Sequence, residues 1–293
     1  MPVIKVISSE QAAGHGSHVA AAVMGAMSAR LSEPAKILPA DRKRDRAEKT
    51  RPGNPNNLTL RQHVFPSKSI GRFTNERGLV SVHDLLRDKV RLAKPRDSIF
   101  CADRAWDERA EKSMKSIEDA FQMLVGPIIA GTATEVRQDQ KSVVDEMYAL
   151  WLMRAQYREL ETQEVQLNGI TGDDLTKEQE ENLEKNSYVF TRKNGMMPAR
   201  QLNGIQLQMR IDNSVRSLAT TVTRWGVIST QDGEFIVPDI PQHGVIPITP
   251  RLALVQSAPD GMIVEQNVAE INQAMKATSL VYCFARNFSN CPF

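Results

Sequence analysis

The sequence predicts an α+β fold, in which long central helices pack against short antiparallel strands and hairpins within one main domain. Three features of the 293-residue chain indicate this class. Apolar residues recur at helical spacing through the middle of the chain, the flanking segments alternate with the period of strands, and the two kinds of segment are grouped. Helices grouped between β-rich segments are typical of α+β proteins rather than of βαβ folds.

The central helices are predicted from apolar residues that recur every three or four positions. One helical face comprises Ala110, Met114, Ile117, Phe121, Leu124 and Ile128. A second long helix is expected to open at a capping-box pair of Thr132 and Glu135. One of its faces carries Val136, Val143, Met147, Leu150 and Tyr157. Further helices are expected after Thr176, which forms a capping box with Gln179, and after Pro198.

Strands are predicted both before and after these helices in the sequence. Two are expected at 78–82 and 89–93. Nearer the C-terminus, segments 223–229 and 235–237 flank Asp232-Gly233, whose residue types favour the positive φ angles of a type I′ turn, so a hairpin is expected there. Short strands at 252–255 and 280–284 enclose a last helix, which Asn267 and Glu270 are expected to cap.

Charge and composition separate an N-terminal arm, residues 1–57, from a main domain, residues 58–293. Residues 1–60 hold nine Lys or Arg against five Asp or Glu, although the whole chain has a net charge of only +2. Residues 41–57 are charged and then rich in Pro, Gly and Asn, which favours a solvated linker over a nucleic-acid contact. We therefore expect a flexible arm that the main domain does not need in order to fold.

The cysteines and apolar runs indicate the compartment. Cys101, Cys283 and Cys291 are few, far apart and without a Cys-x-x-Cys pair, so a zinc ribbon or disulfide framework is excluded. This usage fits a reducing compartment. The longest apolar run, residues 120–130, is too short to span a bilayer. We expect a cytoplasmic protein without membrane contact; a homo-oligomer and a separate protein partner both remain open.

Common catalytic motifs are missing from the sequence. It contains no Gly-rich phosphate loop, no dinucleotide fingerprint, no GxSxG nucleophile elbow and no HExxH zinc motif. These absences argue against P-loop nucleotide enzymes, dinucleotide oxidoreductases, α/β-hydrolases and zincins.

His63 is the first candidate site residue. The order His63, Asn75, His83 resembles the layout of ββα-metal nucleases, in which one His activates water and a later His binds a divalent metal. That layout needs its last His on a helix, yet Val80, Val82 and His83 lie in a segment that alternates as a strand does. We therefore expect His83 on a strand or turn and the nuclease layout to fail. His63 could instead lock the turn before Pro66.

Two carboxylates complete the candidate set, and each has two interpretations. Glu118 lies on the Met114 helix, where it is either a boundary residue, with Glu111 paired to Lys115, or an inward ligand or general base; the sequence alone favours the boundary interpretation. Asp239 follows the 235–237 strand, where it either accepts turn amides or is presented at a site.

Several segments together resemble the bacterial and phage family named domain of unknown function 4238. They are His63 to Phe73, which follows a pattern like HxVPxxYLxxF, Ile117-Glu118, Trp225, residues 235–241, residues 247–254, Asn272 and Val281-Tyr282. The resemblance covers about residues 58–285. This chain departs from the pattern at Gln62, Phe65, Ser69 and Pro238. The resemblance implies that His63, Glu118 and Asp239 recur with the fold, and it implies no activity.

Two function classes follow. The first is a hydrolase acting on nucleic acid, with His63, Glu118 and Asp239 as acid, base or ligand and with a divalent metal as one expected cofactor. The phage and bacterial setting of the resembled family suggests phage–host conflict or toxicity as a context. The second class is a non-enzymatic binding, sensor or assembly protein in which those three residues are structural.

Overall fold

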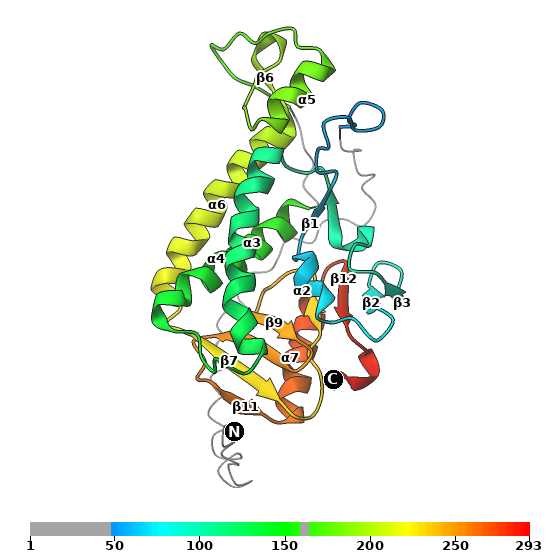
Figure 1. Cartoon of the computed structure of the whole chain (residues 1–293), viewed down its shortest axis with the longest axis vertical. Coiled ribbons are helices and arrows are strands. Elements are labelled where there is room, and N and C mark those ends of the chain that lie inside the picture. The colour runs from blue at the N-terminus through cyan, green and yellow to red at the C-terminus, as the bar shows by residue number, and fades with distance from the viewer. Residues whose placement is uncertain (1–47, 159–163) are drawn as a thin grey trace.

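Three long helices form the centre of the molecule: α3 (Glu108–Ile129), α4 (Lys141–Tyr157) and α6 (Ala199–Thr221) (Figure 1). The structure is a computed structural model that describes residues 48–158 and 164–293. Helix α4 packs against both α3 and α6 and is buried on most of its surface. The predicted face of α3 is confirmed, since Met114, Phe121 and Ile128 are buried.

The start of α4 differs from the prediction. The helix begins at Lys141, after a 3-10 turn (Gln138–Gln140). The Thr132 hydroxyl donates to the Pro127 carbonyl at the end of α3, so it caps no helix. The capping-box pattern of Thr132 and Glu135 was misleading because the chain must first turn away from α3 before it can run back along it.

Two four-stranded sheets flank the helices, and the prediction of short antiparallel strands is confirmed. One sheet has the order β11 (Gly261–Ile263), β7 (Trp225–Thr230), β10 (Leu252–Gln256), β9 (Val245–Thr249). The other has the order β3 (Lys89–Ala93), β2 (Val80–Asp84), β12 (Tyr282–Ala285), β8 (Val237–Pro238). Among the described strands only β11 and β7 pair in parallel. Helix α7 (Glu265–Thr278) packs beside β8.

The hairpin expected around Asp232-Gly233 is wrong. Strand β7 pairs with β10 and β11, while β8 pairs with β12 in the other sheet. Gly233 does have the positive φ that the turn requires, at +80°. Both edges of β7 are taken by strands from later in the chain, so the turn passes the chain from one sheet to the other.

Smaller elements complete the fold. Strand β1 (Arg61–His63) pairs with β4 (Cys101–Asp103), and the short helix α2 (Ser67–Gly71) follows β1. At one end of the long axis, α5 (Lys177–Lys185) stands beside the pair β5 (Val165–Gln166) and β6 (Met196–Met197) (Figure 1). The predicted capping box of Thr176 and Gln179 at the start of α5 is confirmed. Further 3-10 turns lie at Ser98–Phe100, Lys193–Gly195 and Phe288–Asn290.

The last residues of the predicted arm contact this end of the molecule. The Arg51 amide donates to Glu181 Oε1 over 2.6 Å, and its guanidinium donates to Oε2 over 3.1 Å. The predicted border at residue 57 therefore falls inside a segment that contacts α5; residues 1–47 lie outside the described part. No helix in the described ranges is long and apolar enough to cross a membrane.

Candidate functional site

Polar side chains from separate elements meet near the C-terminal end of α4. Strand β1 is fixed there by Gln62, whose buried amide group donates to the Trp106 carbonyl over 2.9 Å and accepts from the Trp106 amide over 3.2 Å. Those two bonds tie β1 to the start of α3. His63, the next residue, is half-buried and pairs in register with Cys101 of β4. Its backbone is thus held by two neighbouring elements.

The hydrogen bond of His63 determines its tautomer. The Nε2 atom lies 3.1 Å from the Pro95 carbonyl oxygen, which can only accept, so Nε2 carries the proton. Burial lowers the pKa of His63, although the Pro95 bond and the nearby Glu118 and Glu111 oppose that effect. The ring is therefore neutral at pH 7, with a lone pair on Nδ1. Nδ1 has no hydrogen-bond partner among the described residues.

Arg154 organises the carboxylates beside His63. This fully buried side chain donates through Nη1 to Glu118, its Nη2 lies 3.8 Å from Glu111 Oε2, and its guanidinium lies 5.6 Å from the centre of the Trp106 ring. Trp106 Nε1 also donates to Glu111 over 2.6 Å. Arg154 therefore anchors two carboxylates of α3 from the interior, and the Trp106 indole holds one of them, Glu111.

The side chains of Glu111 and Glu118 are 23% and 22% exposed, so neither is fully buried. The predicted pair of Glu111 with Lys115 is wrong, because Lys115 donates to Asp119 over 3.0 Å instead. The Glu118 carboxylate pairs with the buried Arg154 from the edge of the helix face, and its role as a ligand or general base stays a prediction.

Asp239 belongs to a neighbouring group. Its carboxylate accepts from the amides of Leu280 and Val281 over 2.9 and 2.7 Å, which is the structural alternative that the sequence left open. Burial raises the pKa of Asp239, and these amides and the charge of Arg158 oppose the rise. Arg158 is the C-cap residue directly after α4, four positions after Arg154. His63 thus lies within electrostatic reach of Glu118 and Arg154, and Asp239 lies within electrostatic reach of Arg158.

The cysteines are poor nucleophiles. Burial raises the pKa of Cys101 to about 11 and the pKa of Cys283 and Cys291 to about 12, and all three thiols are free. A thiol with such a pKa carries almost no thiolate at pH 7. Cys101 therefore contributes packing next to His63 rather than chemistry.

Neither Arg154 nor Arg158 was among the predicted site residues, and Glu111 was expected only as the partner of Lys115. A signal for Arg154 was present: it lies seven residues after Met147 and four after Leu150, within an otherwise apolar stripe of α4. A charged residue in such a stripe is either paired in the interior or misplaced. Its partners on α3 could not be known before the two helices were packed.

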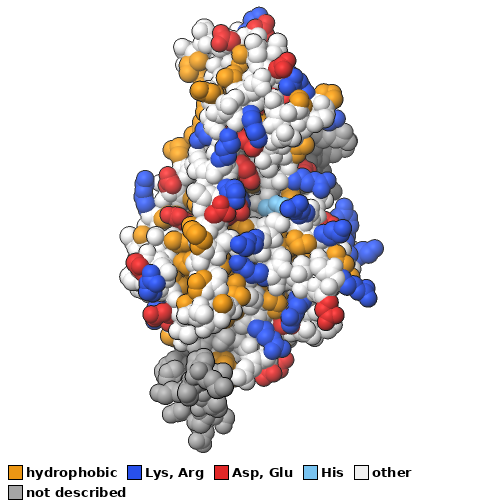
Figure 2. Space-filling model, in the orientation of Figure 1, with side chains coloured by type: hydrophobic (Ala, Val, Ile, Leu, Met, Phe, Trp, Pro, Cys, Tyr) orange, Lys and Arg blue, Asp and Glu red, His pale blue; other side chains and the backbone are white. Residues whose placement is uncertain are grey.

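His63, Trp106, Glu111, Glu118 and Arg154 are called the His63 group below. A basic surface adjoins this group. Residues 58–96 contain nine Lys or Arg and three Asp or Glu. Lys94 and Arg96 are exposed and flank Pro95, whose carbonyl accepts from His63. Figure 2 shows Lys and Arg side chains gathered along the side of the molecule that carries β2 and β3. Such a surface is suited to a phosphate-bearing ligand.

The ββα-metal nuclease layout is not present. His83 lies on β2, as predicted, and its Nε2 is 2.9 Å from Asp88 Oδ1. Asn75 is occupied by its own turn, because Oδ1 accepts from the amides of Arg77 and Leu79. Within 48–158 and 164–293, no three His, Cys, Asp or Glu side chains are arranged to hold a metal ion. The expected divalent metal therefore has no ligand set in this part of the chain.

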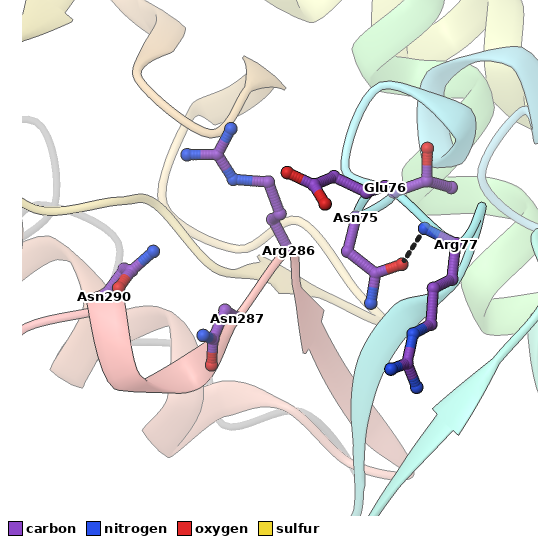
Figure 3. A pocket seen from close by; sticks show the side chains of 7 residues that line it. Asn75, Glu76, Arg77, Arg286, Asn287 and Asn290 are labelled. Carbon is purple, nitrogen blue, oxygen red and sulfur yellow. Dashed lines mark hydrogen bonds between the residues drawn. The ribbon is translucent and has the colours of Figure 1, made fainter.

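A cavity of about 590 Å³ lies between the loop after α2 and the C-terminal 3-10 turn (Figure 3). It is lined by Thr74, Asn75, Glu76, Arg77, Arg286, Asn287 and Asn290. None of the His63 group lines it, and its side chains are largely engaged: Arg286 and Asn290 both donate to Glu234. We therefore place the candidate site at His63 and not at this cavity.

Comparisons with protein-family models, with curated proteins and with solved structures found no match for this chain. The family resemblance described above stays a prediction.

Proposed function

We propose that the protein is a hydrolase acting on nucleic acid, with His63 as its general base. The observation that carries this proposal is the geometry of the His63 ring, in which Nε2 donates to the Pro95 carbonyl and the Nδ1 lone pair is unused, close to the partly exposed Glu118 and Glu111. A base needs a pKa below or near the working pH and a free lone pair, and His63 meets both requirements.

The residues divide the work as follows. His63 Nδ1 takes a proton from a water whose oxygen forms a bond to phosphorus, while the phosphorus–oxygen ester bond breaks and the leaving oxygen takes a proton from solvent. Glu118 and Glu111 stabilise the imidazolium that results, because their charges raise the pKa of His63. Lys94 and Arg96 bind flanking phosphates. In this mechanism Asp239 is a strut and not a catalytic residue.

A matched pair of variants tests this function. Purified protein is incubated with single-stranded DNA, duplex DNA and RNA, and the products are resolved by length. His63→Ala should lower the cleavage rate about 10²- to 10⁴-fold, the usual contribution of a general base. His83→Ala should leave the rate unchanged, since His83 is paired with Asp88 in the turn between β2 and β3. Equal loss in both variants would contradict the assignment of His63.

A role in phage–host conflict or toxicity is part of the same proposal, and it rests on the resemblance alone. Expression of the chain in a bacterial host tests it directly. Wild-type protein should slow growth, and the folded His63→Ala variant should not.

A non-enzymatic binding or sensor protein is the second candidate, favoured by one observation. Both Asp239 oxygens are engaged by backbone amides, and Glu118 is paired with Arg154, as expected of structural struts. If this candidate holds, His63→Ala will lower the melting temperature and weaken nucleic-acid binding, and no substrate will be cleaved by the wild type.

A further inference from the structure

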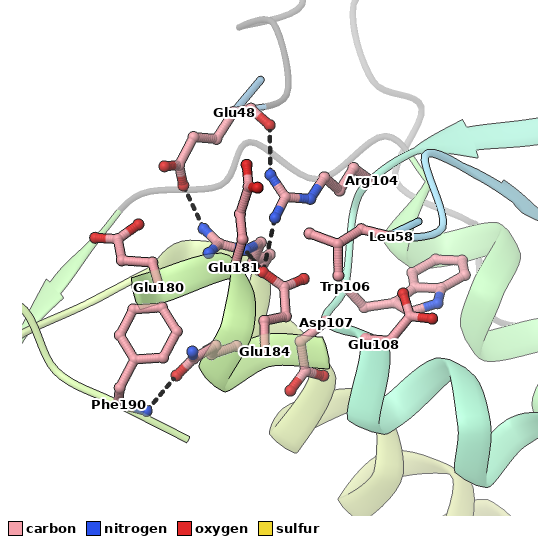
Figure 4. Close-up of polar contacts among 12 residues, drawn as sticks. Glu48, Leu58, Arg104, Trp106, Asp107, Glu108, Glu180, Glu181, Glu184 and Phe190 are labelled. Carbon is pink, nitrogen blue, oxygen red and sulfur yellow. Dashed lines mark hydrogen bonds and ion pairs between the residues drawn. The ribbon is translucent and has the colours of Figure 1, made fainter. Parts of the chain in front are cut away.

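A second charged cluster lies where residue 48 meets α5 and α6, apart from the His63 group (Figure 4). Four cations surround the Glu48 carboxylate and carbonyl: Arg104, Lys177, Arg192 and Arg200. Glu48 Oε1 accepts from Lys177 and from Arg192 Nη2, Oε2 accepts from Arg200 Nη1, and the carbonyl accepts from Arg104 over 2.8 Å.

The cations are held in place without Glu48. Arg192 donates to Glu180 through Nε over 2.5 Å and also pairs with Glu164. Arg200 and Arg104 both donate to Glu184 over 2.7 Å. Glu180 and Glu184 are only 6% and 2% exposed, so the donors that converge on Glu48 are positioned from the interior.

Charge and unused donors both indicate an anion site. Without Glu48, the four cations face three carboxylates, Glu164, Glu180 and Glu184, and the cluster carries one excess positive charge. Arg200 Nη2 and Arg104 Nε are buried without a hydrogen-bond partner among the described residues. Arg200 and Arg104 are each only 4% exposed. A phosphate has more acceptor oxygens than a carboxylate and could occupy such donors.

We propose that this cluster is a phosphate-binding site in which the Glu48 carboxylate is a built-in, intramolecular ligand. A phosphate group, either free or at the end of a nucleic acid, can replace Glu48 on Arg192, Arg200 and Lys177. Replacement releases the Glu48 side chain from Lys177, Arg192 and Arg200, while Arg51 stays bound to Glu181 of α5. The site is independent of the proposed hydrolytic reaction, because it shares no residue with the His63 group.

The test uses the full chain and a matched control. Glu48→Gln removes the resident ligand, and Glu164→Gln removes the same charge from another partner of Arg192 while leaving Glu48 in place. Inorganic phosphate is titrated calorimetrically against chloride at equal ionic strength. We expect Glu48→Gln to bind one phosphate at least tenfold more tightly than wild type or Glu164→Gln, because a tethered competitor has a high effective concentration.

Two oligonucleotides, identical except for a 5′-phosphate, separate the sources of the ligand. If Glu48→Gln binds the 5′-phosphorylated oligonucleotide more tightly than inorganic phosphate, the ligand is the end of a nucleic acid. If it binds the two equally, the ligand is free phosphate. The proposal would be overturned if Glu48→Gln bound phosphate no more tightly than wild type, or no more tightly than Glu164→Gln. Loss of phosphate binding when His63→Ala is added would also overturn it, by placing the anion at the His63 group.

A measurement on the wild type covers the case in which Glu48→Gln does not fold. Trypsin cleavage after Lys49, followed by mass spectrometry, should accelerate several-fold in phosphate and not in chloride of equal ionic strength. An unchanged rate in phosphate would contradict displacement of Glu48.

Discussion

The His63 group and the Glu48 cluster both contain buried arginines paired with glutamates, yet they differ in how many cations and carboxylates they bring together. In the first, one guanidinium, Arg154, is shared by two carboxylates next to a neutral imidazole. In the second, four cations meet four carboxylates and no histidine. Only the first group contains a side chain that can exchange a proton near pH 7. The comparison suggests chemistry at His63 and anion capture at Glu48.

The largest effect is expected at Arg154. Replacement by Met should lower the free energy of unfolding by about 1.5–3 kcal/mol, because two partly exposed glutamates lose their buried, charged partner. Adding Glu118→Gln should recover part of this loss, since fewer unpaired charges remain. Urea denaturation of the wild type and both variants measures the effect. A loss below about 1 kcal/mol in Arg154→Met would mean that Arg154 does not anchor the group.

The second-largest effect is expected in the pH dependence of cleavage and of stability at His63. Because burial lowers the pKa of His63, the folded state holds this ring neutral below its ordinary pKa of 6.5. Cleavage should be constant above pH 6.5 and fall about tenfold per unit below the depressed pKa. The free energy of unfolding should decrease as pH falls below 6.5, because His63 then takes up a proton more readily in the unfolded chain than in the folded protein. Rates from pH 4.5 to 8 test this; an acid limb centred above 6.5 would contradict it.

Glu48 should titrate far lower. Although burial raises its pKa, Arg200, Lys177 and Arg192 outweigh that effect and bring the pKa of Glu48 down to about 2. A depressed carboxyl pKa stabilises the fold above the unfolded value of 4.5, and this contribution is lost as pH falls toward 2. Glu48→Gln should cost about 1 kcal/mol at pH 7, since the side chain is partly exposed. The difference between wild type and variant should shrink at pH 3; a difference that stays constant would contradict the assignment.

The smallest effect concerns the thiol beside His63. Since burial raises the pKa of Cys101 to about 11, iodoacetamide should leave it unmodified at pH 7.5 in the folded state. Cys101→Ser should change the cleavage rate less than twofold. Modification of Cys101 within minutes under native conditions, detected by mass spectrometry, would show that the group opens to solvent.

What the sequence determined by itself is local. The face of α3, the strand that carries His83 and the start of α5 were predicted because helical and strand periods and capping pairs depend on residues a few positions apart.

Only the tertiary structure decided the pairings. Arg154 meets Glu118 across 36 positions, and Glu48 meets Arg192 and Arg200 across 144 and 152. The chain after β7 likewise enters another sheet because strands from later in the sequence take both edges of β7. Such contacts depend on how helices and sheets pack together, and a local pattern carries no information on that packing until the long-range partners are in place.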